Sequence, residues 1–195
     1  RNRSGVEPAE IYLRLGEVLQ APGGDPVLAV SYFQKALDGS NEHAMRALVA
    51  LEQIHHDAGR WDDVARIVEL GAARAESPEA KADLLLRLAD VVAEHHQDST
   101  RAVQILEEAS EYRGDDGDIL TRLSNYHREA GRHHALAETL QRLAARTDEP
   151  EELAELYTER ADLLRVRLNR SEEAVDAYTM ALGCSPSHRG ALEGL

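Results

Sequence analysis

The chain has 195 residues, and 22 basic against 36 acidic side chains give it a formal net charge of −14. A surface this acidic repels phosphate backbones, which disfavours nucleic-acid binding, and no apolar run reaches the roughly 20 residues that a bilayer span needs. One cysteine, Cys184, excludes an internal disulfide framework and a cysteine-rich zinc site.

Helix-forming residues dominate the composition. Only 6 Pro and 13 Gly interrupt the chain, and aromatic residues make up 4% of it. The β-branched and aromatic residues that favour strands are sparse, so we expect an all-α fold whose core uses small and aliphatic contacts. Because Arg1 follows no initiator Met and begins no signal-peptide pattern, we expect the native N-terminus to be missing, and a cytoplasmic location is only the default expectation.

Apolar residues at i, i+3, i+4 and i+7 predict ten amphipathic helices in five consecutive pairs. In chain order the pairs span 9–21 with 25–39, 42–58 with 61–75, 78–95 with 99–112, 116–130 with 133–146, and 150–168 with 171–184. Asp25-Pro26 and Ser77-Pro78 each place a capping side chain before a proline at the first helical position. Gly59 and Gly131 lie where the turns inside the second and fourth pairs need a left-handed residue.

The five pairs share one pattern of large and small residues. The first pair reads Tyr12-x2-Leu15-Gly16-x2-Leu19 and then Ala29-x3-Phe33-x2-Ala36; the fifth reads Tyr157-x2-Arg160-Ala161-x2-Leu164, then Ala174-x3-Tyr178-x2-Ala181 and Pro186. The first large positions lie 36, 37, 35 and 37 residues apart, at Tyr12, Leu48, Leu85, Leu120 and Tyr157. Small residues such as Gly16 and Ala89 let the paired helix approach closely. A single pair leaves a face that only stacking on a neighbour buries.

This pattern resembles that of the tetratricopeptide-repeat (TPR) family, whose period is about 34 residues. The resemblance covers about residues 9–188. It implies an all-α, right-handed α-solenoid of five helix pairs plus the start of a sixth, in a single domain over 1–195. The expected repeats are 9–43, 45–78, 82–116, 117–150, 154–188 and a partial one at 189–195. We expect a fragment of a longer protein; a naturally ragged C-terminal helix is the alternative.

A second period of 72 residues runs through the first. Pro78 recurs as Pro150, and Gly59 recurs as Gly131. Even-numbered pairs use a tight Ala-Gly-Arg turn at 58–60 and 130–132, whereas odd-numbered pairs carry an extra residue that we expect in their internal turn. The predicted building unit is therefore a duplicated module of two pairs.

By the same resemblance, the first helix of each pair lines a concave face, and positions one and five residues after the first large residue face a ligand. The outer row is Leu13, Val49, Leu86, Thr121 and Thr158; the deeper row is Glu17, Gln53, Asp90, Asn125 and Asp162; a third row contains Gln20, His56, Ala93, Arg128 and Arg165. Because the deeper row alternates acids and amides, we expect an acidic groove that binds a basic and hydrophobic peptide or helix of a partner protein. A solvated helix face without a ligand is the alternative.

Some members of this family hold the C-terminal carboxylate of chaperones with Lys and Asn at these positions. Only Asn125 matches that pattern here, so this activity is not expected. Helical repeats near 35 residues also include RNA-reading types, but their grooves are basic and the groove predicted here is acidic.

Other candidate chemistry is weak. Adjacent residues on a helix point about 100° apart, so the pairs His55-His56, His95-His96 and His133-His134 are poor chelators, and no metal is expected. Cys184 and His188 lack an orienting acid, and no glycine-rich phosphate loop is present, so neither a catalytic site nor a cofactor is expected.

The sequence thus predicts a protein-interaction scaffold and no enzyme. The alternatives are a structural spacer or a self-assembly element that associates end to end through Leu192 and Leu195, or the regulatory arm of an enzyme whose catalytic domain lies outside the chain.

Overall fold

The computed structural model describes residues 7–195. These residues form eleven α-helices and one π-helix and contain no strand, which confirms the all-α prediction. The chain divides into two compact units, Arg1–Asp98 and Ser99–Leu195. The division falls inside the third predicted pair, and the single domain over 1–195 stays a prediction.

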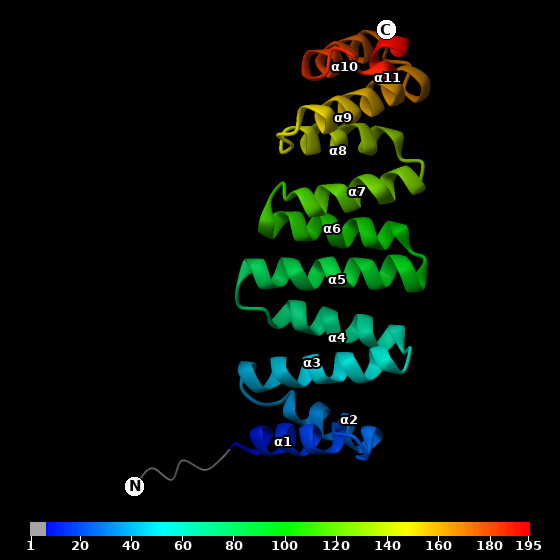
Figure 1. Cartoon of the computed structure of the whole chain (residues 1–195). Helices are drawn as coiled ribbons and strands as arrows, with labels where there is room; N and C mark the ends of the chain where they lie inside the picture. Colours follow the sequence, from blue (N-terminus) through cyan, green and yellow to red (C-terminus); the bar gives the residue numbers. More distant parts are fainter. Residues whose placement is uncertain (1–6) are drawn as a thin grey trace. The chain divides into compact units, whose positions relative to one another are not determined.

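The helices of each unit follow one another in chain order (Figure 1). Unit 1 holds α1 (Pro8–Gln20), α2 (Pro26–Ala36), α3 (Asn41–Asp57), α4 (Trp61–Arg74) and α5 (Pro78–His96). Unit 2 holds α6 (Ser99–Arg113), α7 (Gly117–Glu129), α8 (His133–Ala144), α9 (Pro150–Asp162), the π-helix η1 (Leu163–Arg167), α10 (Ser171–Cys184) and α11 (Arg189–Gly194). The ten predicted helices are present, most with bounds within two residues of those expected.

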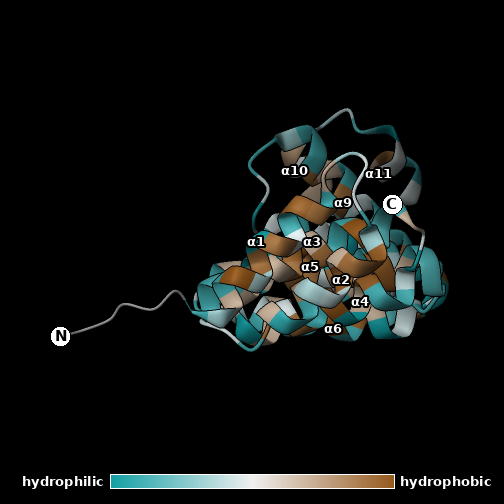
Figure 2. Cartoon of the chain, turned by 90° about the horizontal axis from the view of Figure 1, so that it is seen from below, coloured by the Kyte–Doolittle hydropathy of each residue, from teal (hydrophilic) through white to brown (hydrophobic). Residues whose placement is uncertain are grey.

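Local signals explain where the helices begin. The Asp25 carboxylate accepts hydrogen bonds from the backbone N–H groups of Val27 and Leu28, and Ser77 Oγ accepts one from Ala80. Each cap satisfies donors that the first turn of a helix leaves unpaired. The hydropathy colouring in Figure 2 shows hydrophobic and hydrophilic segments on the same helices, as amphipathic helices require.

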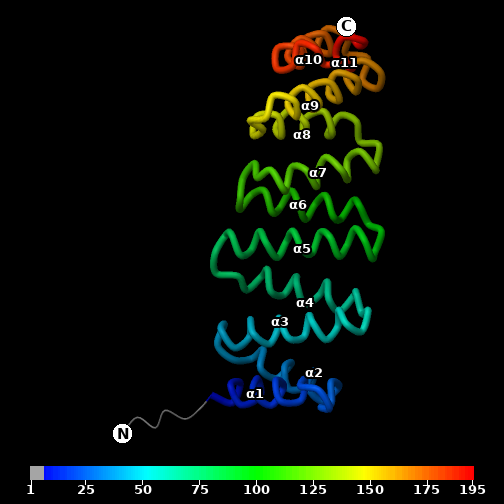
Figure 3. Tube along the Cα trace, viewed as in Figure 1, coloured from blue at the N-terminus to red at the C-terminus, as the bar shows by residue number. Residues whose placement is uncertain are grey.

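The tight turns of the second and fourth pairs have the same geometry 72 residues apart. Gly59 has φ 65° and Gly131 has φ 64°, which confirms the predicted left-handed positions. The next residue closes each turn: Arg60 N–H donates to the His55 carbonyl, and Arg132 N–H donates to the His127 carbonyl, both at 2.9 Å. Figure 3 traces these short reversals between α3 and α4 and between α7 and α8.

The extra residue of the third and fifth pairs lies in the helix end, so the expectation of a longer turn is wrong for them and holds only for the first pair. In the fifth pair the backbone widens into η1, and Leu168 N–H donates to the Leu163 carbonyl. In the third pair Gln97 N–H donates to the Val92 carbonyl in the same i to i−5 pattern. Each widened turn ends in a left-handed residue, Gln97 or Asn169, both at φ 54°. A π-type turn absorbs one residue without lengthening the connection.

The core of unit 1 depends on close helix approach. The Phe33 side chain of α2 is fully buried against α1, in a cluster with Leu13, Ala29 and Ala36. A Cβ atom at Gly16 would lie 2.6 Å from the Phe33 ring, so glycine is the residue that admits the ring. This contact bears out the predicted role of small residues in the first helix of a pair.

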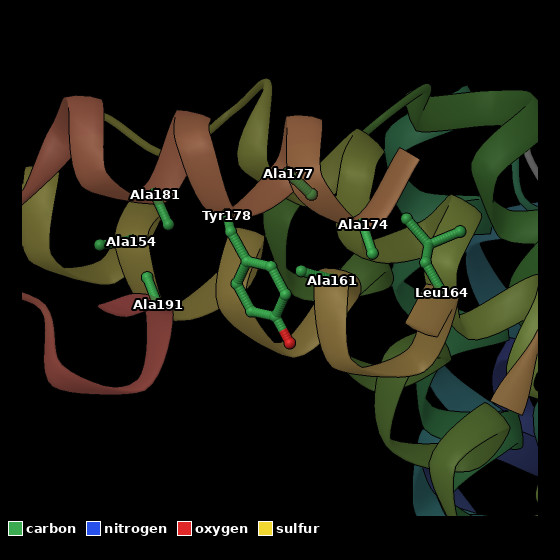
Figure 4. Packing of buried hydrophobic residues seen from close by; sticks show 8 residues of the cluster. All are labelled: Ala154, Ala161, Leu164, Ala174, Ala177, Tyr178, Ala181 and Ala191. Carbon is green, nitrogen blue, oxygen red and sulfur yellow. The ribbon is translucent and has the colours of Figure 1, made fainter. Parts of the chain in front are cut away.

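The core of unit 2 around α9, α10 and α11 is built largely from alanine. The Tyr178 ring projects from α10 between Ala191 and Ala161, and Leu164 lies at the far end of the same cluster, beyond Ala174 (Figure 4). The ring is 1% exposed, and its hydroxyl donates to the Asp162 carboxylate at 2.5 Å. Alanine lets the helices approach closely, and the single large ring fills the space that they leave.

None of the helices among the described residues combines the length and the apolar character that a membrane crossing needs.

Candidate partner-binding surface

The outer row predicted to face a ligand is divided by burial. Val49 is 63% exposed on α3, and Thr121 is exposed on α7. Leu13, Leu86 and Thr158 are buried. Leu13 packs in a cluster with Ala47 and Leu51 of α3, and the Thr158 hydroxyl donates to the Ala154 carbonyl. These three side chains therefore pack the interior, and the structure corrects the expectation that they face a ligand.

In the deeper row of unit 1, Glu17 and Gln53 are exposed but already engaged. Glu17 on α1 accepts a hydrogen bond from Arg46 of α3 at 2.7 Å, and the Gln53 amide donates to Asp57 at 2.7 Å. Glu52 of α3 pairs in the same way with Arg87 of α5. These Arg–Glu pairs connect consecutive first helices, so the surface alternates in charge. Asp90 on α5 is half-buried.

Unit 2 repeats this arrangement on α7 and α9. Arg128 binds both carboxylate oxygens of Glu159, at 2.9 and 3.1 Å, and also donates to the Asn125 amide oxygen at 2.7 Å. Asp162 accepts from Tyr178 and lies 3.4 Å from Arg165. Burial, together with this hydrogen bond and the charge of Asp162, raises the pKa of Tyr178 to about 12. The acidic side chains Glu159 and Asp162 are therefore already paired with arginine or tyrosine side chains.

The third row lies at the ends of the first helices. Arg165 lies over the Tyr178 ring, 5.5 Å from its centroid, and donates to the Gly194 carbonyl at 3.1 Å. His56 is exposed on α3 and meets Trp61 edge-on, with ring centroids 5.0 Å apart. Ala93 on α5 is half-buried, and Gln20 on α1 is exposed.

Only the even-numbered pairs present all three rows to solvent. On α3 these residues are Val49, Gln53 and His56, here named the α3 stripe. On α7 they are Thr121, Asn125 and Arg128, the α7 stripe, and they lie 72 residues after their counterparts. Residues at i, i+4 and i+7 share one helix face, so each stripe is a continuous strip of side chains.

A second feature of unit 1 is a pocket between two consecutive pairs. The zone in which the second helix of one pair packs on the first helix of the next pair is here called a seam. The α2/α3 seam contains a pocket of about 570 Å³. Its lining is apolar with a polar rim and consists of Gln20, Pro26, Val27, Val30, Ile54, Asp57, Ala58 and Arg60. This volume is in the range of sites that hold a small ligand or a large side chain.

The α4/α5 seam is closed by aromatic stacking. Trp61 of α4 lies on His95 of α5 with ring centroids 3.5 Å apart and planes 2° from parallel. Beside them, His96 Nε2 lies 3.1 Å from an Asp62 carboxylate oxygen. One histidine from each of two pairs, His56 and His95, thus packs against Trp61, a role that the separate histidine and tryptophan positions in the sequence did not reveal.

His55 and His127 occupy equivalent buried positions 72 residues apart. Burial lowers the pKa of each imidazole below 6.5, and the adjacent Arg60 or Arg132 lowers it further. Neither Nδ1 atom has a hydrogen-bond partner in the described part of the chain, although His55 Nδ1 lies 3.3 Å from an Asp63 oxygen. His55 is therefore a buried packing residue of α3.

Histidines, acidic residues and Cys184 are the candidate metal-binding and catalytic groups among residues 7–195. There, no three His, Cys, Asp or Glu side chains come together in a way that could hold a metal ion. Cys184 is half-buried, and His188 caps α11 through its Nδ1 atom, which accepts from Ala191 N–H and lies 3.2 Å from the Thr158 hydroxyl.

No protein-family model and no curated protein matches the sequence. Solved structures do resemble the chain. One is YrrB, described as a TPR protein with an unusual peptide-binding site, at 16% identity and a TM-score of 0.53 over 95% of this chain and 90% of that one. A MamA structure matches at 18% identity and a TM-score of 0.53 over 92% of this chain and 93% of its own. A second MamA structure, AMB-1, matches at 16% identity and 0.55 over 95% and 96%.

Identities this low carry information on architecture alone. All three structures nevertheless share the succession of helix pairs across nearly the whole chain. The chain therefore has the tetratricopeptide-repeat fold, as its repeat pattern predicted.

Proposed function

We propose that this chain is a protein-interaction scaffold whose first-helix stripes bind a peptide or a helix of a partner protein. The observation that carries the proposal is the exposure of Val49. An aliphatic side chain that is 63% exposed lies beside the Gln53 amide on one helix face, whereas its counterparts Leu13 and Leu86 are buried. An apolar contact next to a donor and acceptor amide is suited to a peptide backbone and its side chains.

The partner segment that fits this surface carries hydrophobic and basic side chains. The hydrophobic groups would contact Val49, and the net charge of −14 would attract the basic groups. The Arg–Glu pairs beside the stripes moderate this attraction locally, so we expect affinity to depend on the apolar contact and the amides more than on bulk charge. The proposal assigns binding to the chain and no catalytic role.

The test compares affinities for a partner captured from the source cells and then purified. The variant Val49→Glu, Gln53→Ala, Asn125→Ala changes three exposed stripe residues without touching a buried side chain. We expect it to weaken binding by tenfold or more, measured by isothermal titration calorimetry. The control is Val175→Glu, which places the same charge at a half-exposed valine on the second helix α10. Unchanged affinity in the triple variant would remove the stripes from the binding site.

Self-association is the second candidate function. Leu192 and Leu195 are 56% and 58% exposed, and Ile11, Leu15 and Val18 form an exposed apolar strip on α1. The counterparts of Leu15 in the next three pairs are Leu51, Leu88 and Leu123, all buried. We propose that such faces could associate end to end. End-to-end association predicts a molar mass that rises with protein concentration in light scattering. The variants Leu15→Glu and Leu192→Glu should restore the mass of the monomer. A mass that stays constant with concentration in the natural chain would exclude this association.

A further inference from the structure

The pocket in the α2/α3 seam is lined by residues at two positions that are aromatic in the α4/α5 seam and small here. Pro26 and Trp61 are the first residues of α2 and α4, and Ala58 and His95 hold equivalent places at the ends of the first helices. In the α4/α5 seam the indole and the imidazole stack. In the α2/α3 seam the proline and the alanine line an open pocket. The same fold thus displays one seam filled by an aromatic ring and one left empty.

Arg60 on the rim of this pocket lacks the partner that its counterpart has. Arg132, 72 residues later, donates from Nη2 to the Thr100 hydroxyl at 3.0 Å across the α6/α7 seam. The residue equivalent to Thr100 in the α2/α3 seam is Val27, the second residue of α2, which carries no acceptor. Within the described residues the Arg60 guanidinium forms no hydrogen bond or ion pair. The other charge on the rim, Asp57, accepts from Gln53.

We infer that the α2/α3 pocket binds an aromatic side chain of a partner protein, with a carboxylate next to that side chain accepting hydrogen bonds from Arg60. The ring would take the place that the Trp61 indole fills in the neighbouring seam, against Pro26, Val30, Ile54 and Ala58. The carboxylate would take the place that the Thr100 hydroxyl fills beside Arg132. A carboxylate is the stronger choice for this place because a charge-assisted hydrogen bond to a guanidinium is shorter and stronger than a neutral one.

This site is separate from the stripes proposed above. It takes a segment with an acidic group beside a ring, whereas the stripes are proposed to take a basic and hydrophobic segment. The residues that carry it, Pro26, Ala58 and Arg60, belong to neither stripe. Gln53 of the α3 stripe donates to Asp57 on the pocket rim, so the pocket experiment keeps Gln53 unchanged, and the two proposals then fail independently.

The experiment uses N-acetyl-tryptophan, which joins an indole to a carboxylate, and its amide, which lacks the charge. Each is titrated into the methyl-labelled full chain and followed by NMR. We expect saturable shifts at the methyl groups of Val27, Val30 and Ile54, with the carboxylate probe binding about fivefold more tightly or better. Methyl resonances whose chemical shifts do not change on titration, or equal affinity for the two probes, would overturn the inference.

Three variants make the result specific. Arg60→Gln should keep the ring contact and abolish the preference for the carboxylate, while Arg132→Gln, the equivalent change beside Thr100, should leave both affinities unchanged. The double variant Pro26→Trp, Ala58→His transfers the aromatic stack into the open seam and should eliminate binding of both probes. Shifts that survive this double variant would place the probes elsewhere and refute the assignment.

Discussion

The two seams of unit 1 have the same backbone plan and opposite interiors. In the α4/α5 seam Trp61 and His95 are in stacking contact, and in the α2/α3 seam Pro26 and Ala58 border a pocket of about 570 Å³. The difference rests on the side chains at two equivalent positions. A repeat fold can therefore open or fill a pocket at a seam without altering its helices, because each seam is a local contact between neighbours.

The largest effect is expected from emptying the closed seam. Trp61→Ala removes a large ring and its stack on His95, and we expect the free energy of unfolding to fall by about 2–4 kcal/mol. Pro26→Ala, the matched change in the open seam, removes no aromatic ring and should cost less than about 1 kcal/mol. Urea unfolding followed by far-UV circular dichroism measures both, since Trp61 is the only tryptophan. Equal losses would mean that the stack contributes nothing.

Filling the open seam is the reciprocal change. Pro26→Trp with Ala58→His should raise the free energy of unfolding by about 0.5–1.5 kcal/mol, because an aromatic pair adds this much beyond simple burial. The measurement is the same urea titration. Val175→Trp, which puts an indole on an exposed position of α10, serves as the control. A decrease in stability would show that the α2/α3 backbone does not admit the stack.

The two seams should also differ in their response to pH. His55, beside Arg60 at the open seam, has a lowered pKa through burial, whereas the equivalent residue near the closed seam is Val92, which cannot titrate. The unfolded chain takes up protons around the ordinary value of 6.5, before the folded chain does. Stability is therefore complete above pH 6.5 and decreases as the pH falls through this value towards the lowered pKa of the folded state.

His127 adds to this loss in the same direction. Unfolding free energies between pH 7.5 and 5.5 should decline in the natural chain, and the decline should flatten in His55→Leu, His127→Leu. Leucine already occupies the equivalent position at Leu19 and Leu164. An unchanged slope in the double variant would assign the decline to other groups.

The smallest effect is expected from the ion pairs outside the seams. Glu52 and Arg87 connect α3 to α5 at the surface, with side chains 16% and 53% exposed. A double-mutant cycle with Glu52→Gln and Arg87→Gln should give a coupling of about 0.3–1 kcal/mol that shrinks with added salt. The same cycle on Trp61 and His95 should give a larger coupling that salt does not change. A salt-resistant Glu52–Arg87 coupling would contradict this ranking.

Most of the fold was predictable because its signals are local. Caps such as Asp25 and Ser77, prolines at helix starts and the left-handed Gly59 and Gly131 fix helix ends through neighbouring residues. The widened turns before Gln97 and Asn169 were not predictable from the count of residues, because an extra residue can be placed in a turn or in a helix. Only the backbone hydrogen bonds distinguish the two.

The candidate site was less predictable. The row pattern treats Leu13 and Val49 as equivalent. Their burial, however, depends on how each first helix is rotated against the next one. Leu13 is buried in the structure, and Val49 is exposed. Predicting the seam pocket would have required an alignment of the second helices of the pairs as well as of the first helices. Setting Pro26 against Trp61 and Ala58 against His95 is the comparison that would have indicated it.

The repeated Ala-Gly-Arg turn has a consequence for how such a chain can change length. Ala58-Gly59-Arg60 and Ala130-Gly131-Arg132 have the same sequence, nearly the same φ at glycine and the same closing hydrogen bond to a histidine carbonyl. Excising 72 residues between the two glycines would join α3 to α8 through a turn that is already native to both. Gene recombination at this point could lengthen or shorten the protein by whole two-pair modules without inventing a new junction.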